Sequence, residues 1–292
     1  MANNSHAEIS GGVSWRRRIS NALAIGFAGG AALIVLVPLV AILGYLLYRG
    51  AGALNWAFLT QTPKPVGEAG GGMANAMWGS LYILLIGSAI GVPLGIGCGI
   101  YLAEYGRNRF GNALRFVADV LNGVPSIVMG IAAYSLVVVP QQHFSALAGG
   151  IALGIMMVPT ISRAAEEMLL MVPQSIREAA WGLGVAQWRT TLSVTLRTAS
   201  AGVITGIMLA FARVAGETAP LLFTAFGNQF WNFNPNQPTA ALPLQIFVYA
   251  ISPFDEWHRQ AWAGALLLII LIMGTVTVVR VFAARGMLKT GN

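Results

Sequence analysis

The chain has 292 residues, of which 56% are hydrophobic and only 9% are charged. A soluble protein carries about 25% charged residues, so this composition excludes an ordinary water-soluble domain. The 35 glycines point the same way, because glycine lets transmembrane helices pack closely. We therefore predict a single membrane domain that works within the lipid bilayer.

Six apolar stretches are long enough to cross a bilayer, which takes about 20 residues. The first of them is about twice as long as the apolar core of a signal peptide, so we expect it to stay as an anchor. The sequence predicts an all-α polytopic membrane protein with six transmembrane helices, an arm at 1–22, a membrane domain at 23–283 and a tail at 284–292. The stretches are 23–48, 76–103, 116–140, 146–170, 199–223 and 260–282.

The basic residues predict the orientation, because short loops rich in lysine and arginine stay in the cytoplasm. An even number of spans puts both termini on one side, and the arm, two alternate loops and the tail hold most of the cations. We therefore expect both termini on the cytoplasmic side of a bacterial cytoplasmic membrane, and no nucleic-acid partner despite the net charge of +7. The cytoplasmic cations are Arg16, Arg17, Arg18, Arg107, Arg109, Arg115, Arg163, Arg177, Arg189, Arg197, Arg280, Arg285 and Lys289, against Arg49, Lys64 and Arg259 outside.

The charges of the second cytoplasmic loop have simple interpretations. Glu104, Arg107 and Arg109 read as solvated charges of a short turn at the membrane surface. Arg115 and Asp119 are four residues apart, a spacing that predicts a local ion pair on one helix.

Motifs for catalysis and metal binding do not occur. Lysine stands only at positions 64 and 289, and neither follows the glycine pattern of a phosphate-binding loop. His6, His143 and His258 are too dispersed for a metal site. The sequence predicts no cofactor, no catalytic residue and no nucleotide site, so any ATP hydrolysis belongs to a partner. The glycines of the run 87–91 are expected to form a helix-packing surface.

The long cytoplasmic connection at 171–198 predicts two short helices joined by a turn. Pro173 suits a helix start, and Gly184 suits a left-handed turn at a helix end. Ile176, Ala179, Ala180 and Leu183 recur at helical spacing. From the pattern alone, an amphipathic connector on the membrane surface is one interpretation.

A second interpretation comes from a resemblance. Glu178-Ala179-Ala180, three residues and Gly184 resemble the EAA loop of ABC importer permeases, which docks in a cleft of the ATPase. The resemblance implies that Glu178, Ala179, Ala180 and Gly184 contact an ATPase. The family pattern continues through Val194-Thr195-Leu196, but Arg197 replaces its proline.

Further runs in the same order resemble the PstA-type branch of that family, which serves phosphate-specific importers. The resemblance implies a type I ABC importer permease fold and phosphate translocation by alternating access. It implies as partners a homologous PstC-type permease, two cytoplasmic PstB-type ATPase subunits and an extracytoplasmic PstS-type phosphate-binding protein. The runs are 70–76, 93–95, 101–105, 125–128, 212–220 and parts of 226–262.

Arg213 and Glu217 lie four residues apart within the predicted span 199–223. An arginine at the centre of a membrane costs at least about 2.5 kcal/mol, so it should face a partner or a water-filled cavity. The two residues either form a structural ion pair or line a phosphate path in which Arg213 attracts the anion and Glu217 moderates the positive field. The family resemblance links both to translocation, and we include Thr218 and Ser126 in the predicted path.

Three alternatives stay open at this point. A permease for another oxyanion, molybdate or sulfate, would share an intramembrane arginine. A stand-alone channel or ion-coupled transporter would have little use for the docking turn at 178–184. The aromatic outer segment from Phe226 to Tyr249 is either an interfacial anchor or part of a gate that contacts a binding protein.

Overall fold

The structure is a computed structural model that describes residues 15–66, 68 and 70–290, without the side chains of 282–290. His6, the rest of the arm up to residue 14 and the last two residues of the predicted tail lie outside the described residues. The chain forms two compact units, Met1–Tyr48 and Arg49–Asn292.

The first unit consists, as far as it is described, of one long helix. Helix α1 (Trp15–Gly50) begins within the predicted arm and ends two residues into the second unit. Its apolar side chains are almost all exposed, with Phe27 at 81% and Ile34 at 75%. Such a surface is stable only in contact with lipid or with other membrane helices.

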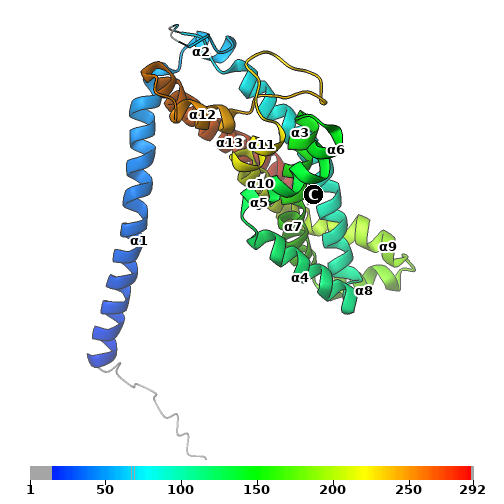
Figure 1. Ribbon diagram of the computed structural model, residues 1–292. Helices are drawn as coiled ribbons and strands as arrows, with labels where there is room; N and C mark the ends of the chain where they lie inside the picture. The colour runs from blue at the N-terminus through cyan, green and yellow to red at the C-terminus, as the bar shows by residue number, and fades with distance from the viewer. Residues whose placement is uncertain (1–14, 67, 69, 291–292) are drawn as a thin grey trace, which may run out of the picture. The chain divides into compact units, whose positions relative to one another are not determined.

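The second unit is built of helices, and the all-α prediction is confirmed for the described residues, which contain no strand and one isolated bridge between Phe226 and Thr239 (Figure 1). Its longest helices are α3 (Ala74–Glu104), α7 (Ala146–Leu170), α10 (Leu196–Ala215) and α13 (Asp255–Thr290). The shorter ones are η1 (Ala51–Ala53), α2 (Trp56–Thr60), α4 (Arg109–Gly123), α5 (Ser126–Ala133), the π-helical turn η2 (Tyr134–Val138), α6 (Val139–Gln141), α8 (Gln174–Gly182), α9 (Gln187–Thr190), the π-helical turn η3 (Thr191–Thr195), α11 (Ala219–Thr224) and α12 (Leu242–Ala250).

Five helical segments of the described residues are long and apolar enough to cross a membrane, and a bent pair, 109–141, makes a sixth if it counts as one span. The bend of 107° falls between α4 and α5. There Val124 is extended, as is common before a proline, because the ring of Pro125 disfavours the helical conformation of the preceding residue. Pro93, by contrast, lies inside α3, which continues past it.

The main packing contact joins α3 to α7 through small residues. An added side chain at Gly91 would meet Cβ of Met157 at 2.8 Å and the carbonyl oxygen of Gly154 at 2.9 Å. Gly87 faces the Gly150 carbonyl oxygen in the same way, at 3.0 Å. The glycines at 87 and 91 are therefore a helix-packing surface, as predicted.

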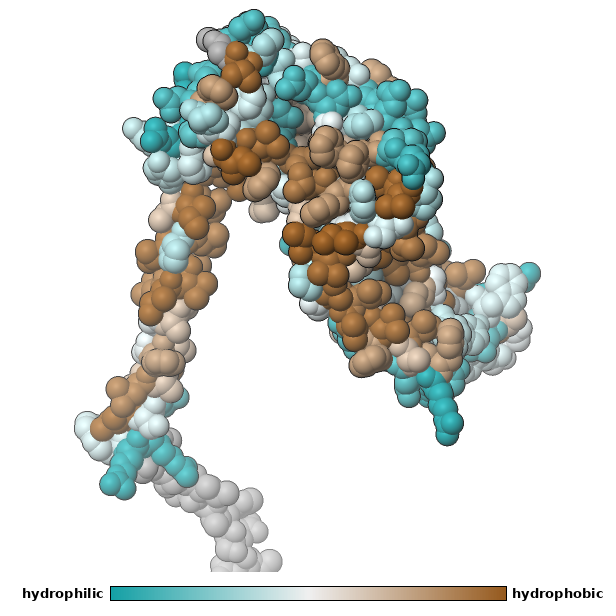
Figure 2. All heavy atoms as spheres, viewed as in Figure 1, coloured by the Kyte–Doolittle hydropathy of each residue, from teal (hydrophilic) through white to brown (hydrophobic). Residues whose placement is uncertain are grey.

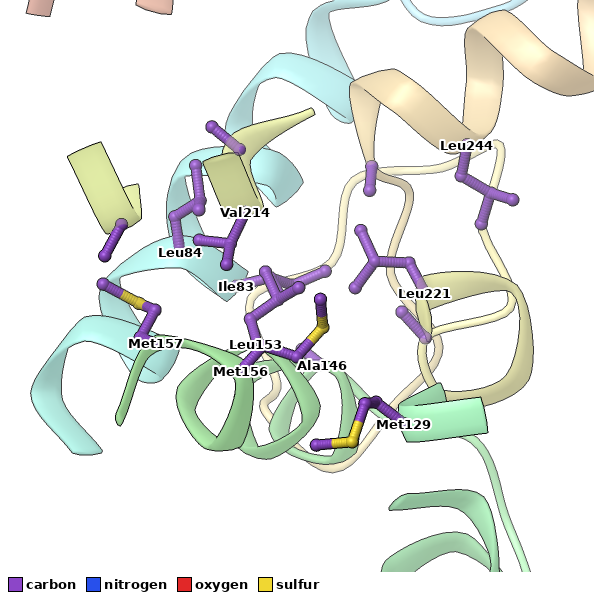
Figure 3. Close-up of a cluster of buried hydrophobic side chains, with 14 of the residues drawn as sticks. Ile83, Leu84, Met129, Ala146, Leu153, Met156, Met157, Val214, Leu221 and Leu244 are labelled. Atoms are coloured by element: carbon purple, nitrogen blue, oxygen red, sulfur yellow. The ribbon is translucent and has the colours of Figure 1, made fainter. Parts of the chain in front are cut away.

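Around this contact lies the largest buried cluster of the second unit. Figure 3 shows side chains from α3, α5, α7, α10, α11 and α12 converging on it. Two methionines of α7, Met156 and Met157, fill the space between the helices. The cluster includes Met129 of α5, and Ala215 and Leu221 on either side of the junction between α10 and α11.

The surface of the second unit is apolar around its middle and polar at its ends (Figure 2). At one end lie α2 and the long loop that precedes α12, and at the other lie α8 and α9 (Figure 1). This distribution is that of a body that crosses a membrane.

The glycine contact gives a first prediction. We expect Gly91→Ala to destabilise the purified protein by about 1–3 kcal/mol, because the added methyl group overlaps Met157 and the backbone of Gly154. Gly97→Ala is the matched control, since it lies on the same helix with open space around it. Thermal unfolding in detergent measures both, and equal melting temperatures for the two variants would contradict the packing.

Candidate functional site

The region around Arg213 is a break between two helices rather than one continuous span. Helix α10 ends at Ala215, Gly216 follows it, and α11 starts at Ala219 with Pro220 in its first turn. The predicted span 199–223 is therefore wrong at its outer end. Arg213 lies in the last turn of α10, and Glu217 lies beyond the helix, so the two do not share a helical face.

The side chains at this break are at least partly accessible. Arg213 is exposed, whereas Glu217 and Thr218 are half-buried. The ion pairs found among the described residues do not include one between Arg213 and Glu217. Thr218 Oγ1 is 3.5 Å from the carbonyl oxygen of Pro243, which ties the break to α12. The guanidinium of Arg213 therefore does not form the structural ion pair with Glu217 that the sequence suggested as one alternative.

Ser126 lies at the second break, as the first residue of α5. Helix α5 packs on α11, where an added side chain at Gly130 would meet Cα of Pro220 at 2.7 Å. The short helices that follow the two breaks are therefore in contact. Among the described residues, however, no hydrogen bond joins Ser126 to Arg213, and the contact is between α5 and α11, the helix that follows the break after Arg213.

A cavity of about 380 Å³ opens beside the end of α10. Its wall is almost entirely apolar, with Trp78, Phe211 and Ala215 among the lining residues. An oxyanion needs charged or hydrogen-bonding partners, so this cavity alone is no anion site.

The connection at 171–198 forms the two predicted short helices, α8 and α9. Gly184 closes α8 with φ of +78°, a left-handed conformation that glycine adopts without steric cost. Its amide donates to the carbonyl of Trp181 at 2.9 Å. Among the described residues, none beyond its immediate neighbours lies within 4 Å of an added Cβ at Gly184, so the turn faces open space.

The predicted docking residues do not all face the same way. Glu178, Ala179 and Gly184 are exposed, but Ala180 is only 8% exposed and packs against the rest of the second unit. Leu183 is 85% exposed and Trp188 is 56% exposed on the same connection. The outward surface therefore combines one carboxylate with large apolar side chains, as in many protein interfaces.

Arg197, which replaces the proline of the family pattern, lies in the first turn of α10. The segment Gln187–Ala215 runs through α9, η3 and α10 as one candidate span. A proline at position 197 would remove a helical hydrogen bond, and arginine keeps it.

Two sequence-based interpretations of charged residues are wrong. Glu104 is not solvated: its side chain is 4% exposed and pairs with Arg177, which had been assigned only to the positive cytoplasmic loops. Arg115 and Asp119 do not pair with each other. Arg115 Nε contacts Glu166 at 2.6 Å, and Asp119 pairs with Arg163 at 3.1 Å. The partners lie far apart in sequence, so helical spacing could not indicate them.

The segment from Phe226 to Tyr249 is a loop up to Ala241, held by several hydrogen bonds, and continues into α12. Asn232 is 8% exposed, and its amide nitrogen lies 2.8 Å from Thr239 Oγ1 and close to three backbone carbonyls. Asn75 of α3 donates to the carbonyl of Asn228 at 2.7 Å. The loop nevertheless keeps aromatic side chains exposed, with Phe230 at 75%. A hydrogen-bonded loop with exposed aromatic side chains suits contact with lipid headgroups or with a protein.

Comparison with known proteins adds to this geometry. The model of the family "binding-protein-dependent transport system inner membrane component" matches residues 91–287. The chain belongs to this family. It is therefore a multi-pass membrane protein and a transport component, not a catalytic subunit.

Similar relatives span nearly the whole chain. The phosphate transport system permease protein PstA of Yersinia pestis is 44% identical over 93% of this chain and 92% of its own length. The protein of the same name from Haemophilus influenzae is 44% identical over 88% of this chain and 91% of its own length. PstA 1 of Mycobacterium tuberculosis H37Rv is 37% identical over 88% of this chain and 85% of its own length.

Solved structures confirm the fold. A chain of the MetNI methionine ABC transporter, in an inward-facing form, matches with a TM-score of 0.53 and 16% identity, over 73% of this chain and 93% of that one. A chain of an amino acid ABC transporter crystallised with histidines matches with a TM-score of 0.55 and 15% identity, over 72% of this chain and 92% of that one. The fold is that of a type I ABC importer permease.

Proposed function

We propose that this protein is the permease subunit of an ATP-driven importer and that it translocates inorganic phosphate by alternating access. The observation that carries the proposal is the 44% identity, over 93% of the chain, to a protein named phosphate transport system permease. At that identity and coverage, the substrate is expected to be shared. The alternatives of a stand-alone channel and of an ion-coupled transporter are not favoured.

Arg213 is the residue that this proposal assigns to phosphate. It is exposed on the isolated subunit and sits at a helix break, where a non-helical backbone is tolerated only beside protein or water. A guanidinium is permanently charged and offers several donors to oxyanion oxygens. Glu217, Thr218 and Ser126 complete the proposed path, with Glu217 offsetting the positive field so that phosphate is released.

In this proposal, partner proteins complete the phosphate path, hydrolyse ATP and deliver phosphate. A second, homologous permease of the PstC type would close the phosphate path opposite Arg213. One of two PstB-type ATPase subunits would dock on the outward surface of α8 and the Gly184 turn, and the two subunits would supply the ATP hydrolysis. A PstS-type binding protein would deliver phosphate at the opposite end, where the outer loop lies. The cytoplasmic arm, 1–22, and tail, 284–292, flank the membrane domain in this arrangement.

Substrate selectivity tests the proposal against the rival oxyanions. The complex of both permeases and the ATPase is reconstituted in liposomes with its binding protein, and uptake of labelled phosphate is measured against excess unlabelled molybdate, sulfate or phosphate. We expect only unlabelled phosphate to compete. Competition by molybdate or sulfate as strong as that by phosphate would overturn the substrate assignment.

Orientation is tested by labelling single cysteines in a Cys98→Ser background. We expect Lys64→Cys and Phe230→Cys to react with a membrane-impermeant maleimide added from outside, since both positions are exposed at the proposed outer end. Glu178→Cys should react only after the membrane is opened. Labelling of Glu178→Cys from outside would overturn both the topology and the docking proposal.

A further inference from the structure

The docking helix α8 is attached to the membrane helices at one charged point. Arg177, in the first half of α8, has a side chain that is 8% exposed, and its Nη1 donates to Oε1 of Glu104, the last residue of α3. Its Nη2 donates to the carbonyl oxygen of Leu169 at the end of α7, at 2.6 Å. One guanidinium therefore joins three helices.

This contact between α8 and α3 depends on the charges of Arg177 and Glu104. The Glu104 side chain is 4% exposed, so separating α8 from α3 would leave two opposite charges unpaired in a buried place, which is strongly unfavourable. Beside them Ile176 packs against the buried cluster that includes Ala103 and Leu169. The rest of the outward face of α8, with Glu178 and Ala179, makes no such contact and stays exposed.

Next to this ion pair, helices α3, α4 and α7 are joined to one another by hydrogen bonds and ion pairs. Arg115 of α4 donates to the carbonyls of Leu102 and Gly106 at 2.9 Å, and pairs with Glu166 of α7. Arg163 pairs with Glu166 at 2.9 Å. A displacement of α8 that reaches Glu104 is thus passed to all three helices.

We propose that the Glu104–Arg177 pair is a positioning joint, which makes α8 move together with α3 and α7 when an ATPase docked on α8 closes. The inference rests on the proposed function, because it assumes that docking. Both side chains are buried within this subunit, so the role assigned to them is one of positioning. Loss of the joint lets the ATPase keep its docking surface on α8 while its movement no longer reaches the membrane helices, so ATP is hydrolysed with little uptake.

The test measures phosphate uptake and ATP hydrolysis in the reconstituted complex with charge-exchanged residues. We expect Glu104→Arg and Arg177→Glu each to lower uptake per ATP hydrolysed at least about tenfold, because each places like charges together. The double exchange restores an opposite pair and should return the ratio to within about threefold of the parent. It loses the Leu169 contact, so full recovery is not expected.

Two further variants keep the test decisive. Arg177→Gln removes the pair without like-charge repulsion, and it should lower the ratio even if the exchanged single variants do not assemble. Glu256→Arg breaks an exposed pair with Arg259 on α13 and should leave the ratio unchanged.

The proposal is overturned if assembled Arg177→Gln keeps the parent ratio, if uptake and hydrolysis fall in equal proportion, or if the double exchange is no better than the single ones. A parent complex that takes up no phosphate with ATP would instead refute the proposed function.

Discussion

Arg213→Gln is expected to reduce phosphate uptake to near background in a complex that still assembles. Glutamine keeps donors but loses the charge, and hydrogen bonds to charged groups contribute about 1.5–3 kcal/mol, equivalent to roughly ten- to a hundredfold in rate. Arg213 has no ion-pair partner among the described residues, so its replacement leaves no carboxylate without its partner. Uptake of labelled phosphate by the reconstituted complex measures the effect, and gel filtration measures assembly.

Two companion variants separate charge from geometry. Arg213→Lys keeps the charge but not the planar set of donors, so it should restore only part of the uptake. Glu217→Gln should be milder and change release, because Glu217 lies beyond α10 and only moderates the field. Normal uptake by assembled Arg213→Gln would remove Arg213 from the path, and loss of the assembled complex would favour a structural role.

Gly184→Val is expected to lower uptake at least about tenfold while the protein still inserts. The left-handed backbone at φ of +78° costs a residue with a side chain about 1–2 kcal/mol, and a β-branched residue is especially disfavoured there. The open space around Gly184 in the isolated subunit is also where an ATPase would approach the backbone. Both effects act on docking, so ATPase co-purification should fall together with uptake.

Two controls locate the cause. Gly184→Asn tolerates the left-handed turn but fills the space, so an intermediate loss would indicate close approach of a partner. Gly52→Val, at an open position of η1 at the other end of the second unit, should import normally. Normal import by Gly184→Val would mean that the loop is only a connector.

Hydropathy predicted the membrane spans well where apolar stretches coincide with single helices. The span 146–170 has the bounds of α7. The span 199–223 failed because the apolar pattern continues across Gly216, where the helix stops. Pro220 carried a signal for that break, since proline is favoured in the first turn of a helix.

The docking turn could be read locally, because the left-handed Gly184 depends on its neighbours in sequence. The charge pairs could not be predicted from local sequence. Arg177 and Glu104 are 73 residues apart and meet only because α8 folds back against the end of α3. The spacing rule paired Arg115 with Asp119, but the buried carboxylate of Glu166 takes Arg115 instead, since an unpaired buried charge is more costly than a lost surface pair.

The most direct test of ATP-driven phosphate import is uptake against a gradient. Liposomes containing the complex are loaded with phosphate and ATP, and the binding protein with a lower concentration of labelled phosphate is added outside. We predict accumulation of net phosphate with ATP and none with a non-hydrolysable analogue. Equal movement with both nucleotides, only down the gradient, would show a channel and contradict the account.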